Sequence, residues 1–489
     1  MKESEPITPA SRKSETIEPQ NVKGFRDLLP RDAYRKNEIV SVIRRVYESY
    51  GFLPVETPGL EYLEILLGEY GDENTKQIFR FKSPEEQDVA LRFDLTVPLA
   101  RIVAQYADLP KPFKRYQVGS VWRADKPDPG RFREFTQFDV DVVGTSSQLA
   151  EAEVISAVVK SLREIGVGDF TVNVNSRRVL NAAISKAGIA PHNAKKVLRI
   201  LDKFFKIGHQ NVMLELTEGR IDSSGDKIPG LGLKENSATL ITSVFVIALS
   251  SPGTSRKKML DFLTEHFGEE SCSDLINLDE LLESLGLGSN VVRFDPTIAR
   301  GLDYYTGPVF EVNLNNKPLF GSVAGGGRYD NLVSRFTGVQ LPAVGFSIGV
   351  DRLLAAISSE ATNANLVDVV VTIMERNKLD EYLKIAEELR AAGIRTDLYL
   401  GTEKSLRKQL QYADKLNARF AVIVGSNEFQ NGMVTIKSLE SGSTLASETS
   451  DRTQWLKESR EKQLEIARRD LVTEMKRLVD KRKLLITLE

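Results

Sequence analysis

The first part of the chain combines a helical pattern with a proline-containing extended pattern. Within residues 31–50 the apolar positions recur at helical spacing: Ile39, Ile43, Val46, Tyr47 and Tyr50. Such spacing places side chains on one face of a helix, and the glycine that follows is a common helix terminator. Residues 52–60 contain two prolines, which disfavour helix at their own and at the preceding position. We therefore predict a helix followed by an extended segment.

Strand-like patterns dominate residues 88–143. Runs rich in apolar residues occupy 89–93, 116–123 and 132–143. The last two runs flank residues 124–130, a stretch with two prolines and a glycine. This arrangement indicates two antiparallel strands joined by a turn.

A mostly helical region separates two strand-like parts of the chain. Helical periodicity covers residues 149–164, and residues 179–287 are mostly helical with an acidic, leucine-rich end. Strand-like sequence resumes at Val291 and continues to Gly349. We interpret the helical region as an insertion into a sheet domain.

The C-terminal part alternates strand, helix, strand, helix and strand, which is typical of a separate small α/β domain. The five segments are 367–374, 379–392, 394–400, 406–416 and 420–424. Residues 455–485 are predicted as a final helix. It carries ten Lys and Arg against six acids, so its charges either contact RNA or are simply solvated.

Composition narrows the class of protein. Of the 489 residues, 41% are apolar and 27% charged, which argues against a disordered chain and against a membrane protein. A net charge of -2 means that a nucleic acid would need a local basic surface. The single cysteine, Cys272, cannot form an internal disulfide, so we expect a cytoplasmic protein. Residues 1–20 are polar, and we predict a disordered tail there.

One predicted strand carries a row of polar side chains. Alternation along residues 135–143 places four residues on one face, opposite apolar ones: Phe135, Gln137, Asp139 and Asp141. Facing outward, they belong to an ordinary half-exposed strand. Facing a cavity, the carboxylates need cationic partners or a ligand. Gln137 and Asp141 are roughly 13 Å apart along a strand, which suits an adenylate-sized ligand.

Arginines, not histidines, are the candidates for chemistry. The three histidines, His192, His209 and His266, all lie in the helical region, so metal sets and histidine triads are improbable. No GxxxxGK[ST] phosphate loop occurs. Arg300 and Arg352 stand in glycine-containing blocks. Several arginines without a phosphate loop suggest guanidinium groups and Mg²⁺ holding nucleotide phosphates.

Three blocks resemble the signature motifs of class II aminoacyl-tRNA synthetases. Residues 122–125 (Trp-Arg-Ala-Asp) with 130–135 (Gly-Arg-Phe-Arg-Glu-Phe) are similar to the second motif. Residues 345–352 (Gly-Phe-Ser-Ile-Gly-Val-Asp-Arg) are similar to the third. The helix that leads to Pro58 is similar to the first motif, at the dimer interface.

Four further blocks resemble histidyl-tRNA synthetases. Residues 300–305 (Arg-Gly-Leu-Asp-Tyr-Tyr) and 324–330 (Ala-Gly-Gly-Gly-Arg-Tyr-Asp) are similar to the two histidine-specific motifs. Residues 23–27 (Lys-Gly-Phe-Arg-Asp) and 91–96 (Leu-Arg-Phe-Asp-Leu-Thr) are similar to the opening and histidine-binding blocks. The combination is far more specific than any one block.

The resemblance implies an ATP site. Arg123 would hold the α-phosphate, Asp125 the adenine amino group and Phe135 the adenine ring. Arg131 and Arg352 would hold the outer phosphates. ATP is then a substrate used with Mg²⁺, and no metal site with dedicated protein ligands is expected.

The resemblance also implies a histidine site, made of Asp94, Leu95, Thr96, Arg123, Gln137, Asp141, Arg300, Tyr304 and Tyr305. Asp94, Thr96 and Gln137 would bind the amino group. Asp141 and Tyr305 would hydrogen-bond the imidazole. Arg300 and Arg123 would be catalytic, because they would stabilise the charge that develops when a carboxylate attacks the α-phosphorus.

The expected activity is histidine–tRNA ligation, and the expected partners are histidine, ATP and histidine tRNA. The protein is expected to be a homodimer. The alternative is an inactive paralogue, a regulatory subunit of ATP phosphoribosyltransferase, which lacks the C-terminal domain and usually the full arginine set.

The expected fold is α+β: a class II antiparallel sheet flanked by helices, with a helical insertion and a C-terminal α/β anticodon-binding domain. The expected boundaries are tail 1–20, catalytic domain 21–178 and 289–361, insertion 179–288, and anticodon-binding domain 366–489.

Overall fold

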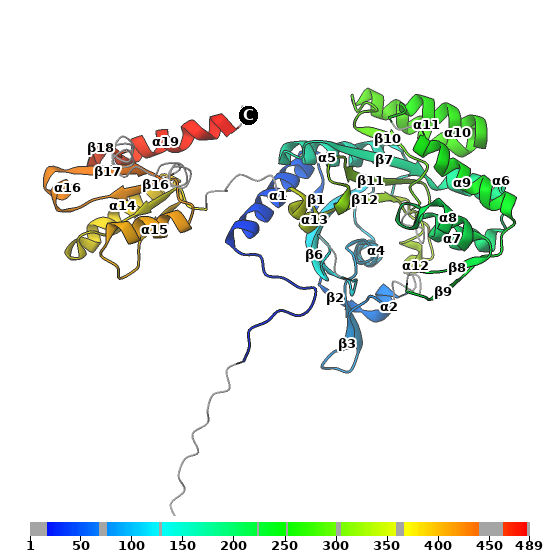
Figure 1. Cartoon of the computed structure of the whole chain (residues 1–489), viewed down its shortest axis with the longest axis horizontal. Coiled ribbons are helices and arrows are strands. Elements are labelled where there is room, and N and C mark those ends of the chain that lie inside the picture. The colour runs from blue at the N-terminus through cyan, green and yellow to red at the C-terminus, as the bar shows by residue number, and fades with distance from the viewer. Residues whose placement is uncertain are drawn as a thin grey trace, which may run out of the picture. The chain divides into compact units, whose positions relative to one another are not determined.

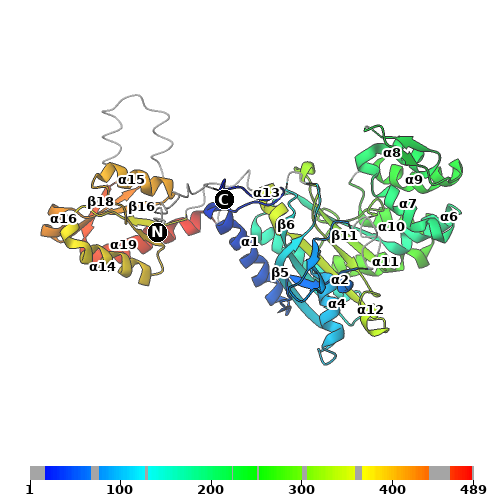
Figure 2. The same cartoon turned by 90° about the horizontal axis from the view of Figure 1, so that it is seen from below.

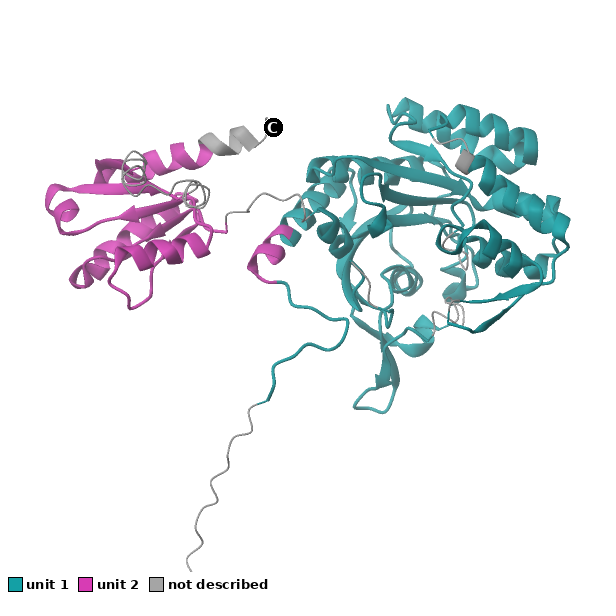
Figure 3. Cartoon of the chain, viewed as in Figure 1, with its two compact units in different colours: residues 1–28, 36–359 teal, residues 29–35, 360–489 magenta. Residues whose placement is uncertain are grey.

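The computed structural model describes residues 17–67, 76–126, 130–222, 224–250, 253–299, 305–357, 366–439 and 463–486. The chain divides into two compact units (Figure 3). Unit 1 comprises Met1–Leu28 and Lys36–Ser359, and unit 2 comprises Leu29–Arg35 and Glu360–Glu489. Most of the predicted tail lies outside the described residues, and residues 17–20 are exposed and form no helix or strand.

Unit 1 is built on an eight-stranded sheet (Figure 1). Its order is β1 (Leu53–Pro54), β5 (Phe113–Trp122), β6 (Glu134–Val143), β13 (Ala343–Gly349), β12 (Ser322–Arg328), β11 (Pro308–Leu314), β7 (Phe170–Ser176) and β10 (Val292–Phe294). Neighbouring strands are antiparallel except in the two outermost pairs, β1 with β5 and β10 with β7. The predicted antiparallel strand pair, β5 and β6, is confirmed.

A layer of helices covers one face of this sheet. It contains α1 (Pro30–Ser49), α5 (Leu149–Ile165), α10 (Arg256–Phe267), α11 (Glu269–Ser284) and α13 (Val350–Ile357). Their apolar side chains share one core with Phe138, Val140 and Val142 of β6. Tyr47 of α1 packs edge-on against Phe138, with ring centroids 5.2 Å apart. The helices predicted at 31–50 and 149–164 are therefore confirmed, and the polar side of β6 faces the opposite way.

A smaller layer packs on that opposite face. It consists of α4 (Thr96–Gln105), α2 (Leu63–Leu66) and a three-stranded sheet of β2 (Leu60–Tyr62), β4 (Asp88–Leu91) and β3 (Arg80–Lys82). Phe93, Val97 and Leu99 join a core with Phe113 and Val143 of the large sheet. The layer thereby covers the sheet at the end of the polar row on β6. The short helices α12 (Ser334–Thr337) and η1 (Pro318–Phe320) complete the described elements of unit 1 around the sheet.

Four helices form a separate core within the predicted insertion: α6 (Arg177–Lys186), α7 (Pro191–Leu201), α8 (Phe204–Leu216) and α9 (Glu235–Ser250). A two-stranded ribbon, β8 (Gly219–Ile221) with β9 (Lys227–Pro229), accompanies them. Figures 1 and 2 show these helices together at one end of unit 1. The limits 179–288 stay a prediction, since α10 and α11 share the core of the large sheet.

Unit 2 contains a five-stranded sheet in the order β15 (Thr396–Leu398), β14 (Val369–Val371), β16 (Phe420–Ile423), β17 (Met433–Ser438) and β18 (Gln463–Ala467). Its helices are α14 (Leu379–Ala391), α15 (Leu406–Lys415), α16 (Ser426–Asn431) and α19 (Leu471–Ile486), with the 3-10 turns η3 (Arg376–Lys378) and η4 (Arg468–Asp470). The predicted alternation over 367–424 is confirmed. In the described part of the chain, no helix is both long and apolar enough to span a bilayer.

The prediction of one helix over 455–485 is wrong in part. Residues 455–462 lie outside the described residues, and 463–467 form strand β18 rather than helix. This strand pairs antiparallel with β17, from Gln463 opposite Lys437 to Ala467 opposite Met433. The ladder of hydrogen bonds to β17 outweighs the local helical preference, because strand pairing is decided by a partner distant in sequence. The helix itself begins at Leu471.

Candidate active site

The polar row on β6 is buried, so it faces inward and not toward solvent. Asp139 and Asp141 are each 2% exposed. The fully buried Arg115 of β5 stands directly opposite Asp141 and pairs with it, Nη2 to Oδ2, at 2.8 Å. Tyr329 donates its hydroxyl proton to the other oxygen of Asp141 at 2.5 Å. The buried carboxylate therefore has the cationic partner that burial demands.

Glycines let other chain segments approach this row. Gly345 and Gly349 of β13 stand opposite Asp141 and Gln137, and Gly119 of β5 also stands opposite Gln137. A side-chain carbon added at Gly345 would overlap the carboxylate of Asp141. The glycines thus let the side chains of Asp141 and Arg92 lie close against the sheet, where a larger residue would displace them.

Several polar atoms of the row have no hydrogen-bond partner among the described residues. They are Arg115 Nε and Nη1, Gln117 Oε1, Gln137 Oε1, Asp139 Oδ1 and Asp141 Oδ2, the last of which has only its ion pair with Arg115. All these residues share one face of β5 and β6, since Arg115 is opposite Asp141 and Gln117 opposite Asp139. Burying polar atoms without partners is costly. Their concentration on one face therefore marks a site for a polar ligand.

The electrostatics follow from burial. Burial raises the pKa of Asp139 to about 7, although Arg115 lowers it, and Asp141 raises it further. Burial also raises the pKa of Asp141, while Arg115 and the Tyr329 hydroxyl act in the opposite direction. Close acidic groups with raised pKa values are a feature of functional sites.

The block 94–96 lies beside these acids. Asp94 Oδ1 accepts a hydrogen bond from Val97 N at 3.0 Å, at the beginning of α4. The carbonyl of Leu95 accepts one from Arg115 Nη2 at 3.2 Å. Thr96 is the first residue of α4. The structure thus brings the predicted residues Asp94, Leu95 and Thr96 together with Asp141, through Arg115.

Arg123 is held so that its outer nitrogens are available. Its Nε donates to the carbonyl of Phe93 at 3.1 Å. Its guanidinium lies over the rings of Phe93 and Phe135, at 4.3 and 5.3 Å from their centroids. Its two terminal nitrogens make no hydrogen bond or ion pair with the described residues, so a planar fork remains for an anion.

The remaining predicted ATP residues have partners in this structure. Arg131 pairs with Asp125 at 2.5 Å, although the two were expected to bind different parts of ATP. Arg352 donates to the carbonyl of Ser322 at 2.8 Å. The neighbouring Asp351 accepts from the backbone N of Thr136 at 2.6 Å, which ties the third-motif block to β6.

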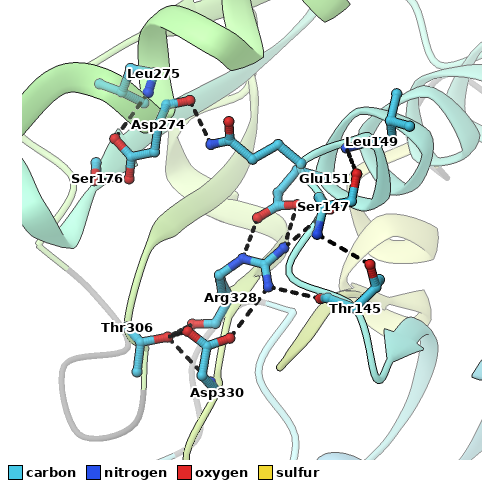
Figure 4. Close-up of polar contacts among 11 residues, drawn as sticks. Thr145, Ser147, Leu149, Glu151, Ser176, Asp274, Leu275, Thr306, Arg328 and Asp330 are labelled. Carbon is cyan, nitrogen blue, oxygen red and sulfur yellow. Dashed lines mark hydrogen bonds and ion pairs between the residues drawn. The ribbon is translucent and has the colours of Figure 1, made fainter. Parts of the chain in front are cut away.

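The predicted residues Arg300 and Tyr304 lie outside the described residues, whereas Tyr305 is half-buried. Next to it, Thr306 is anchored by the block 324–330 (Figure 4). Its backbone N donates to the Arg328 carbonyl at 2.8 Å, and its hydroxyl donates to Asp330 at 2.7 Å. Arg328 forms a two-armed pair with the fully buried Glu151 of α5, at 2.5 and 2.7 Å.

Family models match most of the chain. A model described as histidyl-tRNA synthetase matches residues 24–353, and an anticodon-binding-domain model matches residues 368–476. The chain belongs to the histidyl-tRNA synthetase family. This confirms the resemblance found in the sequence, and the C-terminal anticodon-binding domain with it.

Relatives of this family match along nearly the whole chain. A "Histidine--tRNA ligase" of Paracoccus denitrificans is 41% identical over 485 residues, which cover 94% of this chain and 97% of the relative. One of Caulobacter vibrioides is 40% identical over 480 residues, covering 94% and 96%.

A crystal structure of histidyl-tRNA synthetase from Nostoc has a TM-score of 0.77 at 32% identity, covering 94% of this chain and all of that one. A Bacillus halodurans structure described as an ATP phosphoribosyltransferase regulatory subunit/histidyl-tRNA synthetase has a TM-score of 0.66 at 25% identity, and covers 83% of this chain and 98% of that one. The predicted class II fold of this histidyl-tRNA synthetase family member is confirmed.

Sequence reasoning missed Arg115, Tyr329 and Ser347 as members of the site. A signal for Arg115 was present, because alternation along residues 113–122 places Arg115, Gln117 and Gly119 on one face. Tyr329 stands in the block 324–330 that resembles a histidine-specific motif, but nothing local shows that its hydroxyl reaches Asp141, 188 residues away in sequence. The described residues contain no group of three or more His, Cys, Asp or Glu side chains suited to a metal ion.

Proposed function

We propose that the protein is a histidine–tRNA ligase, which activates histidine with ATP and then transfers it to the 3' end of histidine tRNA. The observation that carries the proposal is the buried acidic and amide row beside the open guanidinium of Arg123. One part suits an amino acid with several N–H groups, and the other suits a phosphate. Family membership and the names of the relatives support the same chemistry.

In the first step the carboxylate of histidine attacks the α-phosphorus of ATP and pyrophosphate leaves. Arg123 is proposed to hold the α-phosphate, because its fork is free and its stacking fixes the plane of the guanidinium. Arg300 is proposed as the second catalytic arginine on the resemblance alone. Magnesium enters as part of the substrate, bound to the phosphates of ATP, and not as a resident ion.

The other site roles stay proposals. Phe135 is proposed to stack on adenine, from the strand position next to Arg123. Asp125 and Arg131 would have to exchange their mutual pair for contacts with ATP, and Arg352 would add a contact to the outer phosphates. Asp94, Thr96 and Gln137 are proposed for the amino group of histidine, and Tyr304 and Tyr305 for its side chain.

The alternative, a regulatory paralogue, is less supported. The expected difference was a missing C-terminal domain, whereas this chain matches the anticodon-binding-domain model over residues 368–476. Charging separates the two functions: the protein should attach histidine to a histidine tRNA transcript and leave an alanine tRNA transcript uncharged. A protein that binds histidine but charges neither tRNA would support the regulatory function.

Cytoplasmic location is proposed together with this function. Cys272 is a free, buried thiol, and a thiol without a disulfide partner is typical of a reducing compartment.

Unit 2 is proposed to bind the anticodon arm, partly through α15. Lys404, Arg407, Lys408 and Lys415 lie on or beside this helix and are exposed, but Lys408 already pairs with Glu403 at 2.9 Å. A triple variant with alanine in place of Lys404, Arg407 and Lys415 should bind tRNA more weakly. The slope of the logarithm of its tRNA affinity against the logarithm of salt concentration should become shallower by about 2 to 3 units. Binding measured at several salt concentrations checks this.

Lys408→Ala is the matched control, and it should change the slope much less, since its charge is already paired. If the triple variant keeps the affinity and salt slope of the wild type, α15 is merely solvated and the anticodon surface lies elsewhere.

A homodimer is proposed through the first-motif segment. Exposed apolar side chains gather in and around it: Leu53, Leu60, Tyr62, Phe81 and Tyr106. Three of them belong to a surface groove with Pro58 and Ile102. A patch of this kind is typical of a contact surface, and a second copy of the chain is the occupant that the motif implies.

Tyr62→Glu should convert the dimer into a monomer at micromolar concentration, because it buries a charge in an apolar interface. Sedimentation velocity measures the change. Phe205→Glu, at another exposed apolar side chain, on α8, should leave the dimer intact. A wild-type protein that sediments as a monomer would contradict the proposal.

A further inference from the structure

Asp139 lies in the middle of the polar row but was assigned no role. It stands between Gln137 and Asp141 on the same face of β6, and both of its cross-strand neighbours, Gln117 and Ser347, are polar. It is 2% exposed. A carboxylate this deeply buried needs a partner for each of its oxygens.

Only one side of Asp139 is occupied. The Ser347 hydroxyl hydrogen-bonds to it, and Ser347 Oγ in turn accepts from Gln137 Nε2 at 2.9 Å. Its Oδ1 has no hydrogen-bond partner among the described residues. The chain from Gln137 through Ser347 therefore fixes the carboxylate and leaves one oxygen available.

Asp141, by contrast, is already engaged. Its Oδ1 accepts from the Tyr329 hydroxyl, and its Oδ2 pairs with Arg115. The hydroxyl and the guanidinium hold both oxygens from within the protein. Each acid thus has one oxygen without a hydrogen bond among the described residues, but that of Asp141 has an ion pair with Arg115, whereas Asp139 Oδ1 remains for a ligand.

We propose that Asp139 Oδ1 accepts a hydrogen bond from a ring nitrogen of bound histidine and thereby determines specificity, next to Asp141, which Arg115 and Tyr329 hold in place and which the resemblance assigns to the same imidazole. The inference rests on the proposed function, because it names a further contact in the same amino-acid site. The position of Asp139 supports the proposal. Asp139 lies farther along β6 than Gln137 from Arg123, the residue proposed to hold the α-phosphate.

The charges around Asp139 set its response to pH. The groups that act on it are Arg115, Asp141, Asp94, Arg92, Tyr47 and Tyr329. Burial has the largest effect on Asp139 and, together with these charges, raises its pKa to about 7. Below that pH the free protein carries a neutral acid there, and above it a carboxylate, which is the stronger acceptor. An asparagine at this position does not titrate.

The test measures pyrophosphate exchange by the wild type and by Asp139→Asn from pH 6 to pH 8. The KM for histidine and the KM for ATP are determined at each pH. The variant should raise the histidine KM about 10- to 100-fold at pH 8, as for loss of a hydrogen bond to a charged group. The ATP KM should change less than about threefold. The ratio of the histidine KM of variant and wild type should grow from pH 6 to pH 8. Titration of histidine itself cancels in this ratio.

Asp274→Asn is the matched control, because Asp274 is a buried carboxylate of α11 that accepts from Ser176 outside the site. It should leave the histidine KM and its pH dependence unchanged. If Asp139→Asn does not fold, as judged by thermal unfolding, Asp139→Glu carries the test: it should raise the histidine KM and retain the pH dependence.

An unchanged histidine KM in the folded variant, or a ratio that does not vary with pH, would overturn the role of Asp139. Such a result would leave the proposed function standing, since the wild type would still show exchange that depends on histidine. Wild-type protein without that exchange would instead contradict the function itself.

Discussion

Arg123→Ala should lower the kcat of histidine-dependent pyrophosphate exchange about 100- to 1,000-fold. Among the described residues, Nε is the only atom of the Arg123 side chain that hydrogen-bonds to the protein, through the Phe93 carbonyl. The rest of the guanidinium is oriented by two aromatic rings, so its fork is preorganised for the phosphate. Steady-state kinetics of the exchange measure the loss, and thermal unfolding should show a stable fold.

Two further variants make this result specific. Arg123→Lys should restore less than about a tenth of the lost activity, because an ammonium group lacks the planar fork and stacks poorly. Arg293→Ala removes another arginine whose Nε bonds one carbonyl, that of Ser289, and it should leave kcat nearly unchanged. If Arg123→Ala retained near-normal exchange, the α-phosphate would be held by other groups.

Arg328→Met should reduce the free energy of unfolding of unit 1 by about 3 to 5 kcal/mol. The substitution leaves Glu151, which is fully buried, without the two-armed partner that Figure 4 shows. It also removes the contact with Asp330, the carboxylate that holds the Thr306 hydroxyl. Chemical unfolding of variant and wild type measures the difference.

The pair can be separated from its surroundings by a double variant. Arg328→Met with Glu151→Leu should recover part of the lost stability, since two apolar side chains replace a buried pair at little cost. A single variant as stable as the wild type, or a double variant less stable than the single one, would show that the Glu151–Arg328 pair does not hold the two elements together.

Local periodicity predicted most elements of the fold. The helices at α1 and α5 and the alternation of unit 2 follow from apolar spacing, because one face of each element packs against a core. Strand β18 was not predictable in this way. Its five residues extend because β17 offers an open edge, and that partner lies outside any local window of sequence.

For the site, the sequence predicted which types of residue are present but not how they are arranged. Alternation placed Gln137, Asp139 and Asp141 on one face, but it left open whether that face was buried. The answer depends on the smaller layer around α4 and on Arg115, which come from other parts of the chain. The pairing of Arg131 with Asp125 was equally hidden, because both residues were assigned to ATP from the motif and not from their mutual distance.

The most direct measurement of the central claim is the exchange of labelled pyrophosphate into ATP by the purified protein, with each of the twenty amino acids supplied in turn. The buried acidic row and the open guanidinium of Arg123 predict exchange that depends on histidine, requires Mg²⁺ and needs no tRNA. A protein that binds histidine yet shows no exchange, or that exchanges equally with another amino acid, would contradict histidine activation at this site.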